Sequence, residues 1–391
     1  MISPQQERSR MQLQGYKRSD GRVGFRNYVL VVPLTGCNME VARRIAAAVP
    51  GATCLGHPNG CDLQMRDFDL FGSILEHFVT HPNVGAVLFL TMGCAASLSL
   101  HLPAKANASG RLVKTLNVVQ SGTTRTVEAG VKIVQEMIEE LRGVEREPAA
   151  FSALVIGTKC GASDANSFAY CHQVVGRACD LLVEKQATVV LAENCELVGG
   201  AEPLSQRANT PAIGAKIREM AEEVNRGWKS RFGVSFDDFA LKNTNRESYI
   251  KRSLEHAAKA GSTPFCGFFD MSEIVKGPGL VILDTPNTDL ESVTCLAAAG
   301  CNITLFTTGR GTPIGSPAAI TIKITATEQT FKNMEENIDI CVAGVIDGKE
   351  TVDKAAERVV ETVIKSANGE LTKAERLGHW EVAIPIRGVT Y

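Results

Sequence analysis

The sequence lacks the short motifs that identify several large classes of enzyme. It contains no G-x-G-x-x-G fingerprint, no Walker phosphate-binding loop and no H-E-x-x-H zinc motif. Each of these motifs places glycines, a lysine or histidines around one kind of ligand. Their absence removes the usual sequence support for a dinucleotide-binding enzyme, an NTPase or a zinc protease.

Long apolar runs and runs of one charge are also missing. No stretch is apolar for long enough to span a bilayer, and residues 1–8 lack the apolar centre of a signal peptide. The 41 basic and 43 acidic residues give a net charge of −2, without a basic run or a basic and aromatic stripe. This balance disfavours nucleic acids and anionic membranes as partners. We therefore expect a cytoplasmic protein, and its 44% hydrophobic and 21% charged residues are typical of globular chains.

Cysteine is plentiful, but no two cysteines form a C-x-x-C pair. The twelve cysteines are spread over the whole chain, which argues against a disulfide framework and a zinc ribbon. Four apolar runs end in a cysteine, at Cys37, Cys94, Cys160 and Cys195. If these runs are parallel strands, their thiols gather at the sheet edge where open α/β sheets bind ligands. Inert packing is the competing interpretation of each thiol, because free cysteine is a common core residue.

The spacing of apolar residues predicts an α/β protein. Short apolar runs of strand type, such as 28–33 and 84–90, alternate with helical patterns such as 125–141. A chain of 391 residues is too long for one ordinary core, and the charged segment 142–148 ends in proline. We therefore predict two α/β domains, residues 1–148 and 149–391. We expect mainly parallel sheets flanked by helices, with a site at the strand carboxyl ends.

Polar groups that can carry chemistry follow several of the predicted strands. His57 and Cys61 share a turn, and imidazole and thiolate both bind transition metals, although a surface turn explains them equally well. Glu193 and Glu196 follow a strand, where they suit metal ligation or acid–base work, or are solvated turn charges. Arg310 lies between two glycines, which favours a carboxylate- or phosphate-binding loop over a merely solvated arginine.

A second candidate for anion binding is the small-residue segment 121–124, which precedes a predicted helix. The free N–H groups at a helix start can bind an anion. An ordinary helix cap is the preferred interpretation, because serine and threonine favour that position.

Blocks distributed over nearly the whole chain resemble the altronate/galactarate dehydratase family. Its members are sugar-acid dehydratases, and their relatives include the large subunit of sulfolactate sulfo-lyase. The most specific match is the intact Phe-Thr-Thr-Gly-Arg-Gly block, Phe306–Gly311. The other matching blocks are Gly15–Asn27, His57–Cys61, His81–Asn83, Gly93–Cys94, Ser121–Thr123 and Cys160–Asp164. The chain departs from the family pattern at Ala95, which replaces an acid, and at the bulkier segment Ser167–Gln173, so a reshaped pocket is expected.

The resemblance implies a metal-dependent lyase that converts a sugar acid or a related hydroxy acid into a 2-oxo acid by β-elimination. It implies a divalent metal, typically Fe²⁺, with Mn²⁺ or an iron–sulfur cluster as alternatives. The expected metal ligands are His57, Cys61, Cys94 and Cys160. The expected catalytic residues are Asp164, Glu193, Glu196 and Arg310, and the expected substrate-binding residues are Thr308, Gly309, Arg310, Ser163 and Thr123.

The resemblance also implies a partner. Single-chain members of the family carry a small SAF domain before the opening block, and this sequence starts without one. A small SAF-like subunit is therefore expected, together with a homo-oligomer as the default for enzymes of this size. Two alternatives to the dehydratase stay open: the large subunit of a sulfolactate sulfo-lyase, and a non-catalytic family member with a scaffold role.

Overall fold

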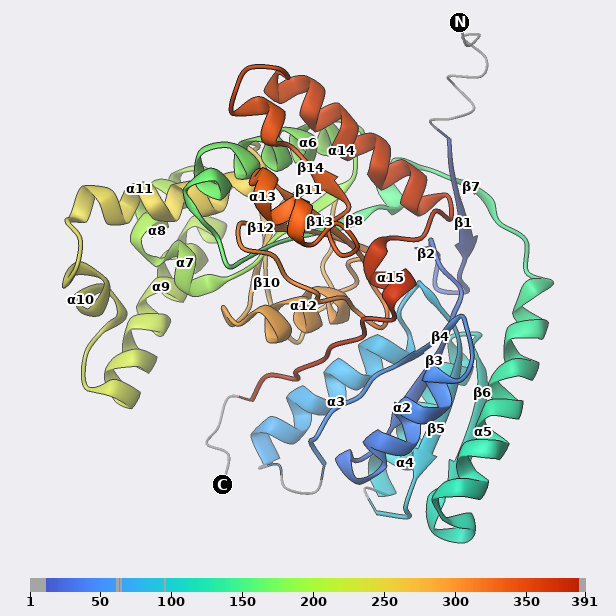
Figure 1. The fold of residues 1–391 in the computed structure, drawn as a ribbon. Coiled ribbons are helices and arrows are strands. Elements are labelled where there is room, and N and C mark those ends of the chain that lie inside the picture. The colour runs from blue at the N-terminus through green and yellow to red at the C-terminus, as the bar shows by residue number, and fades with distance from the viewer. Residues whose placement is uncertain (1–11, 61–62, 64, 95, 387–391) are drawn as a thin grey trace, which may run out of the picture.

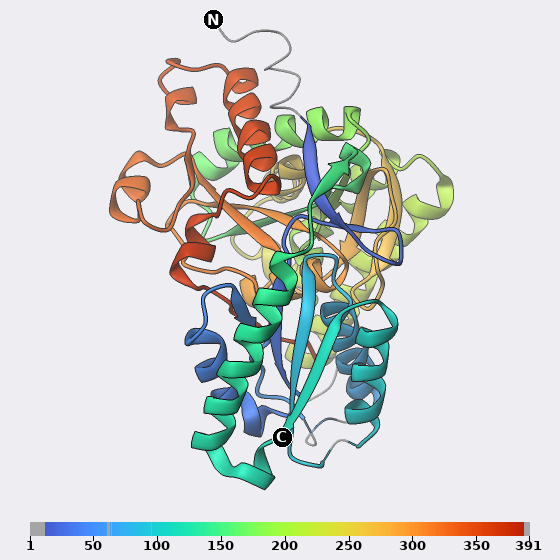
Figure 2. The same ribbon diagram turned by 90° about the vertical axis from the view of Figure 1, so that its right-hand side faces the viewer.

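The chain folds into two α/β units, which lie one above the other in Figures 1 and 2. A computed structural model describes residues 12–60, 63, 65–94 and 96–386. Each unit is built on a parallel sheet with helices on both faces, one sheet of four strands and one of seven, which confirms the predicted fold class. None of the described helices is both long and apolar enough to cross a bilayer.

The smaller sheet belongs to the N-terminal unit and has the order β4-β3-β5-β6. Its central strands β3 and β5 consist almost entirely of buried apolar residues, as parallel strands covered on both faces do. The strands are β3 (Tyr28–Pro33), β4 (Ala52–Cys54), β5 (Val84–Thr91) and β6 (Leu112–Asn117). One face is covered by α2 (Met39–Ala47) and α5 (Val118–Arg142), and the other by α3 (Met65–Val79) and α4 (Ala96–Ala108).

The larger sheet belongs to the C-terminal unit and has the order β10-β11-β9-β8-β12-β13-β14. Its strands are β8 (Val155–Gly161), β9 (Thr188–Leu191), β10 (Phe265–Asp270), β11 (Gly279–Asp284), β12 (Ile303–Thr308), β13 (Ile320–Thr325) and β14 (Ile340–Cys341). From β8 the chain adds strands on one side of the sheet, and it then returns to add β12 on the other side. The boundary between β8 and β12 is therefore a topological switch point, where open α/β sheets bind ligands.

Ten helices accompany this sheet among the residues that the structure describes. They are α6 (His172–Glu184), α7 (Asn194–Leu197), α8 (Ala201–Gln206), α9 (Pro211–Phe232), α10 (Phe236–Leu241), α11 (Arg246–Ala257), α12 (Asp289–Ala298), α13 (Glu328–Asn333), α14 (Val352–Ala367) and α15 (Lys373–Leu377). The pattern over 205–228 predicts one helix, but α8 and α9 are separate. The break occurs where Thr210 caps α9 through the N–H of Ile213, with Pro211 at the first helical position.

The two ends of the chain cross between the units. The first strand, β1 (Leu13–Lys17), pairs with β2 (Val23–Gly24) and β7 (Glu147–Ala149), and Leu13 lies in the core of the C-terminal unit. In the other direction, Trp380 packs against the core of the N-terminal unit. Each unit therefore packs against a segment from the opposite end of the chain, and these contacts hold the two units together (Figure 1).

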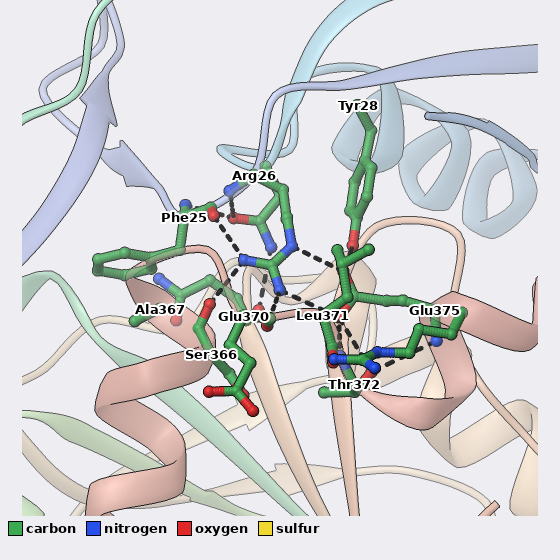
Figure 3. Close-up of polar contacts among 12 residues, drawn as sticks. Phe25, Arg26, Tyr28, Ser366, Ala367, Glu370, Leu371, Thr372 and Glu375 are labelled. Carbon is green, nitrogen blue, oxygen red and sulfur yellow. Dashed lines mark hydrogen bonds and ion pairs between the residues drawn. The ribbon is translucent and has the colours of Figure 1, made fainter. Parts of the chain in front are cut away.

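A buried ion pair between Arg26 and Glu375 strengthens this connection (Figure 3). The Arg26 Nε lies 2.6 Å from the Glu375 carboxylate, and the Tyr28 hydroxyl donates to the same carboxylate at 2.5 Å. The two Arg26 Nη atoms donate to the carbonyl oxygens of Ser366, Glu370 and Phe25. We call Arg26, Tyr28 and Glu375 the inter-unit tether.

Candidate active site at the carboxyl ends of β8 and β12

Two loops meet at the switch point of the larger sheet. Strands β8 and β12 pair so that Gly161 lies opposite Thr308, and beyond them the Arg310 N–H donates to the Ala162 carbonyl at 3.1 Å. Gly309 permits this approach, because a Cβ at that position would lie 2.5 Å from the Asp164 side chain. The predicted residues of these two segments are therefore brought together, with Ser163 between Ala162 and Asp164.

Asp164 acts as an anchor of these loops. Its carboxylate accepts hydrogen bonds from the Thr327 hydroxyl at 2.7 Å and from the backbone and side chain of Ser167 at 2.8 and 2.9 Å. Burial works against ionisation, but these hydrogen bonds prevail and lower the pKa of the Asp164 carboxyl below its usual value. A carboxylate that is committed in this way holds the loop more readily than it accepts a proton.

Arg310 is the free cation of these loops. Its side chain is exposed, and within the described part of the chain its guanidinium has no ion pair or hydrogen bond. An unpaired guanidinium at a strand edge is available for a planar oxyanion, which it binds through two parallel hydrogen bonds. Thr308, in contrast, is buried, and its hydroxyl accepts from the Gly311 N–H at 2.9 Å.

A network of buried charges lies beneath the end of β8. The Glu193 carboxylate pairs with the ammonium groups of Lys159 and Lys259, the latter at 2.9 Å, and accepts from the Cys160 N–H at 3.1 Å. Lys159 also lies 3.0 Å from the carboxylate of Asp289. Burial disfavours the charged form, but the two lysines lower the pKa of Glu193 well below its ordinary value. Glu193 is only 2% exposed, so a substrate cannot reach its carboxylate. The carboxylate instead holds the two lysine side chains in place.

The backbone conformation of Glu193 also indicates that its contacts hold it in place. Its φ of 79° lies in the left-handed region, which a non-glycine residue rarely adopts. Such strain persists where the surrounding contacts determine the geometry, and it concentrates at functional sites. Here the contacts are the two lysines and the Thr285 hydroxyl, which accepts from the Glu193 N–H at 3.0 Å.

Cys160 lies between this network and two histidines. Its Sγ is 3.3 Å from Nδ1 of His256 and 3.4 Å from the Glu193 carboxylate. Burial and Glu193 oppose ionisation of the thiol, but Lys259, His256 and His172 together lower the pKa of Cys160 to about 6. Burial likewise opposes the charged form of His256, but Cys160 and Glu196 raise the pKa of this imidazole to about 9. A thiolate beside an imidazolium is therefore the favoured state near neutral pH.

Glu196 completes a chain of contacts that leads to the surface. One oxygen of its carboxylate lies 2.7 Å from Nε2 of His256. This contact is an ion pair and not a hydrogen bond, because the oxygen does not lie along the direction of the N–H bond. The other oxygen accepts from the Asn287 side chain at 2.7 Å. The Glu196 side chain keeps 30% of its surface exposed, against 4% for His256. The two predicted glutamates thus lie in different surroundings. Glu193 is buried, and Glu196 is partly exposed at the edge of the cluster.

The predicted metal ligands lie on two different sheets. His57 and Cys94 follow strands of the smaller sheet, and Cys160 lies near the carboxyl end of β8 in the larger one. His57 is buried, with Nε2 2.8 Å from the Pro33 carbonyl, and Cys94 is exposed. Cys61 lies outside the described residues. Across residues 12–60, 63, 65–94 and 96–386 no three His, Cys, Asp or Glu side chains are grouped to hold a metal ion.

The expected metal set includes Cys61, which lies outside the described residues, so the metal stays a prediction. Thr123, an expected substrate-binding residue, is exposed in α5, which packs on the sheet of the N-terminal unit. The charged side chains around Cys160 lie at the other sheet; we call them the β8 cluster. Nine of the described cysteines are free thiols: Cys37, Cys54, Cys160, Cys171, Cys179, Cys195, Cys266, Cys301 and Cys341.

Four residues of the cluster have no counterpart among the sequence-based predictions: Lys159, His172, His256 and Lys259. Lys159 had a signal, because a lysine inside an apolar strand is rarely buried unless it is paired. The others come from α6, the end of α11 and the turn that follows α11, up to 99 residues from Cys160, where nothing local marks them. A cleft of about 770 Å³ between the units is lined by residues of α2 and α15 and shares no residue with this cluster.

The arrangement of these groups indicates the class of chemistry that the site supports. A buried acid–base pair and an unpaired guanidinium at neighbouring strand ends suit proton transfer on a small carboxylate. The chain belongs to the D-galactarate/altronate dehydratase family: the model of the family's C-terminal domain matches residues 151–390, and that of its second domain, described as D-galactarate dehydratase/altronate hydrolase, matches residues 15–142.

The chain is similar to lyases of two kinds. The β subunit of (2R)-sulfolactate sulfo-lyase from Chromohalobacter salexigens is 30% identical over 377 residues, which cover 95% of this chain and 96% of that subunit. The altronate dehydratases of Bacillus subtilis and Escherichia coli are 30% and 29% identical, and the matches cover 96% and 97% of this chain and 78% of each relative. Sequence identity does not separate the two kinds.

Proposed function

We propose that this chain is a lyase that removes water from a sugar acid or a related small 2-hydroxy acid by β-elimination and so forms a 2-oxo acid. The observation that supports this most strongly is the unpaired Arg310 at the switch point of a sheet whose next strand ends in the Cys160–His256 pair. The guanidinium binds the substrate carboxylate, which also makes the hydrogen on the adjacent carbon more acidic in the transition state.

The elimination needs a base, a stabilised intermediate and a departing group. The base removes the proton next to the carboxylate, and the electron pair of that bond becomes the carbon–carbon double bond. The bond from the neighbouring carbon to the departing oxygen breaks with its electron pair. The resulting enol then takes a proton on carbon, releases the proton of its hydroxyl group and becomes the 2-oxo acid. The Arg310 guanidinium, which has no ion pair among the described residues, stabilises the anionic intermediate.

Sulfite is the second candidate for the departing group. It is favoured by a match that covers nearly the full length of a sulfo-lyase subunit. The same proton removal then precedes carbon–sulfur cleavage. Because that relative is named as a subunit, we also propose that a small partner chain completes the active form, as the family resemblance implies.

An activity screen tests the proposal. The protein is incubated with altronate, galactarate or sulfolactate, with and without a small partner chain, and with either Fe²⁺ or a chelator. A 2-oxo acid without sulfite identifies a dehydratase, and sulfite in equal amount identifies a sulfo-lyase. If neither product forms under any of these conditions, the lyase proposal is wrong and the scaffold alternative stands. Metal analysis of the purified protein tests the predicted metal separately.

A further inference from the structure

The cleft of about 770 Å³ between the two units has no part in the proposed function. One wall consists of α2 and the edge strand β4 of the N-terminal unit. The other wall consists of β13, α15 and the residues that follow α15 in the C-terminal unit. Sites for small organic molecules measure about 300–1,000 Å³, so the cleft is large enough to hold one.

Most of the charged groups that line the cleft already have partners. The Arg44 guanidinium lies 2.8 Å from the Glu40 carboxylate, and the carboxylate of Glu375 belongs to the inter-unit tether. The imidazole of His379 lies 2.7 Å from the carboxylate of Glu381. Both glutamates of the lining are therefore paired with an arginine, and neither is left to balance another cation.

Two arginines of the lining keep unpaired nitrogens. Arg43 of α2 is exposed and has no hydrogen bond or ion pair within the described part of the chain. Arg376 of α15 is exposed too, and its Nε donates to the Leu371 carbonyl at 3.1 Å, whereas its two Nη atoms have no partner among the described residues. One free guanidinium thus comes from each unit, and such groups bind carboxylate, sulfonate or phosphate.

Two threonine hydroxyls in the lining are buried without a partner. Thr53 lies in β4 and Thr321 in β13, so each unit supplies one of them. The two residues are 5% and 1% exposed, and neither hydroxyl has a hydrogen-bond partner within the described chain. Burial of a hydroxyl without a partner costs free energy, which a ligand against it recovers by accepting or donating a hydrogen bond.

The rest of the lining is largely apolar. Leu371 and Leu377 are 48% and 44% exposed, and the half-buried Trp380 packs against the core of the N-terminal unit. An apolar molecule in the cleft would remove the surface of these side chains from water, which is favourable. Free cations and apolar walls in one cavity suit a molecule that has an anionic group on an apolar body.

We propose that the cleft binds a small organic anion with an apolar body, of the class of aromatic carboxylates, sulfonates and phosphates. Arg43 and Arg376 bind the anionic group, and the two threonine hydroxyls meet its polar atoms. Tyr28 and Glu375 of the inter-unit tether also line the cleft (Figure 3). Because the two units each supply a wall, the bound anion stabilises their arrangement. The site is separate from the β8 cluster and does not depend on the lyase function.

The first test locates a fluorescent anion of this class, 8-anilinonaphthalene-1-sulfonate, on the full-length protein. The sequence contains two tryptophans, Trp228 and Trp380. In Trp228→Phe only Trp380 remains, and we expect its excitation energy to pass to the bound probe. The aromatic rings around Trp228 are the alternative place for the probe, and Trp380→Phe reports on them. Energy transfer from Trp228 alone overturns the proposal, and so does a lack of probe binding.

The second test measures the dissociation constant of the probe. Arg43→Met should raise it roughly tenfold or more, because hydrogen bonds from a charged group to the sulfonate are lost. Arg125→Met, at an exposed arginine of α5, is the matched control and should leave it unchanged. N-phenyl-1-naphthylamine, the neutral counterpart of the probe, should also bind about tenfold more weakly. If Arg43→Met matches the wild type, or if both probes bind equally, the cleft does not recognise an anion.

The third test separates a ligand contact from a structural role. Thr321→Val keeps the shape of the side chain and removes an unpaired hydroxyl, so Tm without probe should not fall, while the probe should bind more weakly. In the wild type, saturating probe should raise Tm by about 2–5 °C. A lower Tm with unchanged affinity removes the hydroxyl from the site, and an unchanged Tm with probe removes the stabilising role. No substrate is present in these experiments, so their failure leaves the lyase proposal standing.

Discussion

The molecule contains two buried clusters of charged side chains, which differ in how completely their polar groups are paired. In the inter-unit tether, Arg26 and Glu375 are each surrounded by partners, and the described chain supplies a hydrogen bond to each of the three Arg26 nitrogens. In the β8 cluster, Cys160 meets two histidines, one of them with an unpaired nitrogen, and Glu196 and Asp289 remain partly open to solvent. A network in which every polar group has a partner stabilises the fold. A network with unpaired or solvent-exposed groups can still bind a ligand.

The difference teaches that burial and charge do not by themselves identify an active site. Both clusters join residues that are far apart in the sequence, and both shift the pKa values of their members. What separates them is whether every donor and acceptor has a partner within the protein. Variants in the two clusters should therefore fail in different ways, the tether in stability and the site in turnover.

The largest effect on stability is expected for Arg26→Met. This change leaves the Glu375 carboxylate buried without its cation, which should lower the free energy of unfolding by about 3–5 kcal/mol. Urea denaturation measures the loss. Arg142→Met is the matched control, because its pair with Glu139 is exposed and such pairs contribute at most about 1 kcal/mol. Equal losses in the two variants would show that the tether is not specially stabilising.

Arg310→Met should show the opposite behaviour. The lost hydrogen bonds to a substrate carboxylate correspond to about 1.5–3 kcal/mol, or roughly a 10- to 150-fold lower kcat/KM. Stability should stay unchanged, because the exposed guanidinium has no partner among the described residues. Steady-state kinetics and denaturation check both halves, with Arg125→Met in α5 as an exposed control. A normal kcat/KM in Arg310→Met would remove this residue from the site.

Gly309→Ala tests whether the two loops of the site must approach closely. The new Cβ would lie 2.5 Å from the Asp164 side chain, and relief of that clash should cost about 1–3 kcal/mol. The control is Gly227→Ala in α9, where no atom lies within 4 Å and alanine should add up to about 1 kcal/mol. Thermal denaturation compares the two. If both alanines stabilise, the loop contact is looser than described.

The smallest effect concerns the pH dependence of the tether. Burial opposes ionisation of Glu375, but Arg26 and Tyr28 lower the pKa of its carboxyl below the ordinary value. The stability that the pair contributes is therefore present above about pH 4.3, the unfolded value, and is lost as the pH falls through the lower folded value. The stability difference between wild type and Glu375→Gln should be largest at pH 7 and should shrink below pH 4. A difference that is constant with pH would contradict the assignment.

Much of the site could be predicted from sequence because its residues lie at the ends of strands or just beyond them. Cys160, Asp164, Glu193, Thr308 and Arg310 each come within a few residues of a strand end, and parallel strands share their carboxyl edge. The sequence pattern does not say which sheet a strand joins. His57 and Cys94 also follow strands, but those strands form the smaller sheet, whereas Cys160 belongs to the larger one.

The sequence by itself determined the α/β class, the apolar strands, the loop 306–311 and the family, since all of these depend on residues close together in the chain. Only the tertiary structure decided which charges became partners. His256 and Lys259 reach Cys160 and Glu193 because α11 and the turn after it pack at the end of β8. Their meeting depends on the packing of distant elements, and no local pattern records it.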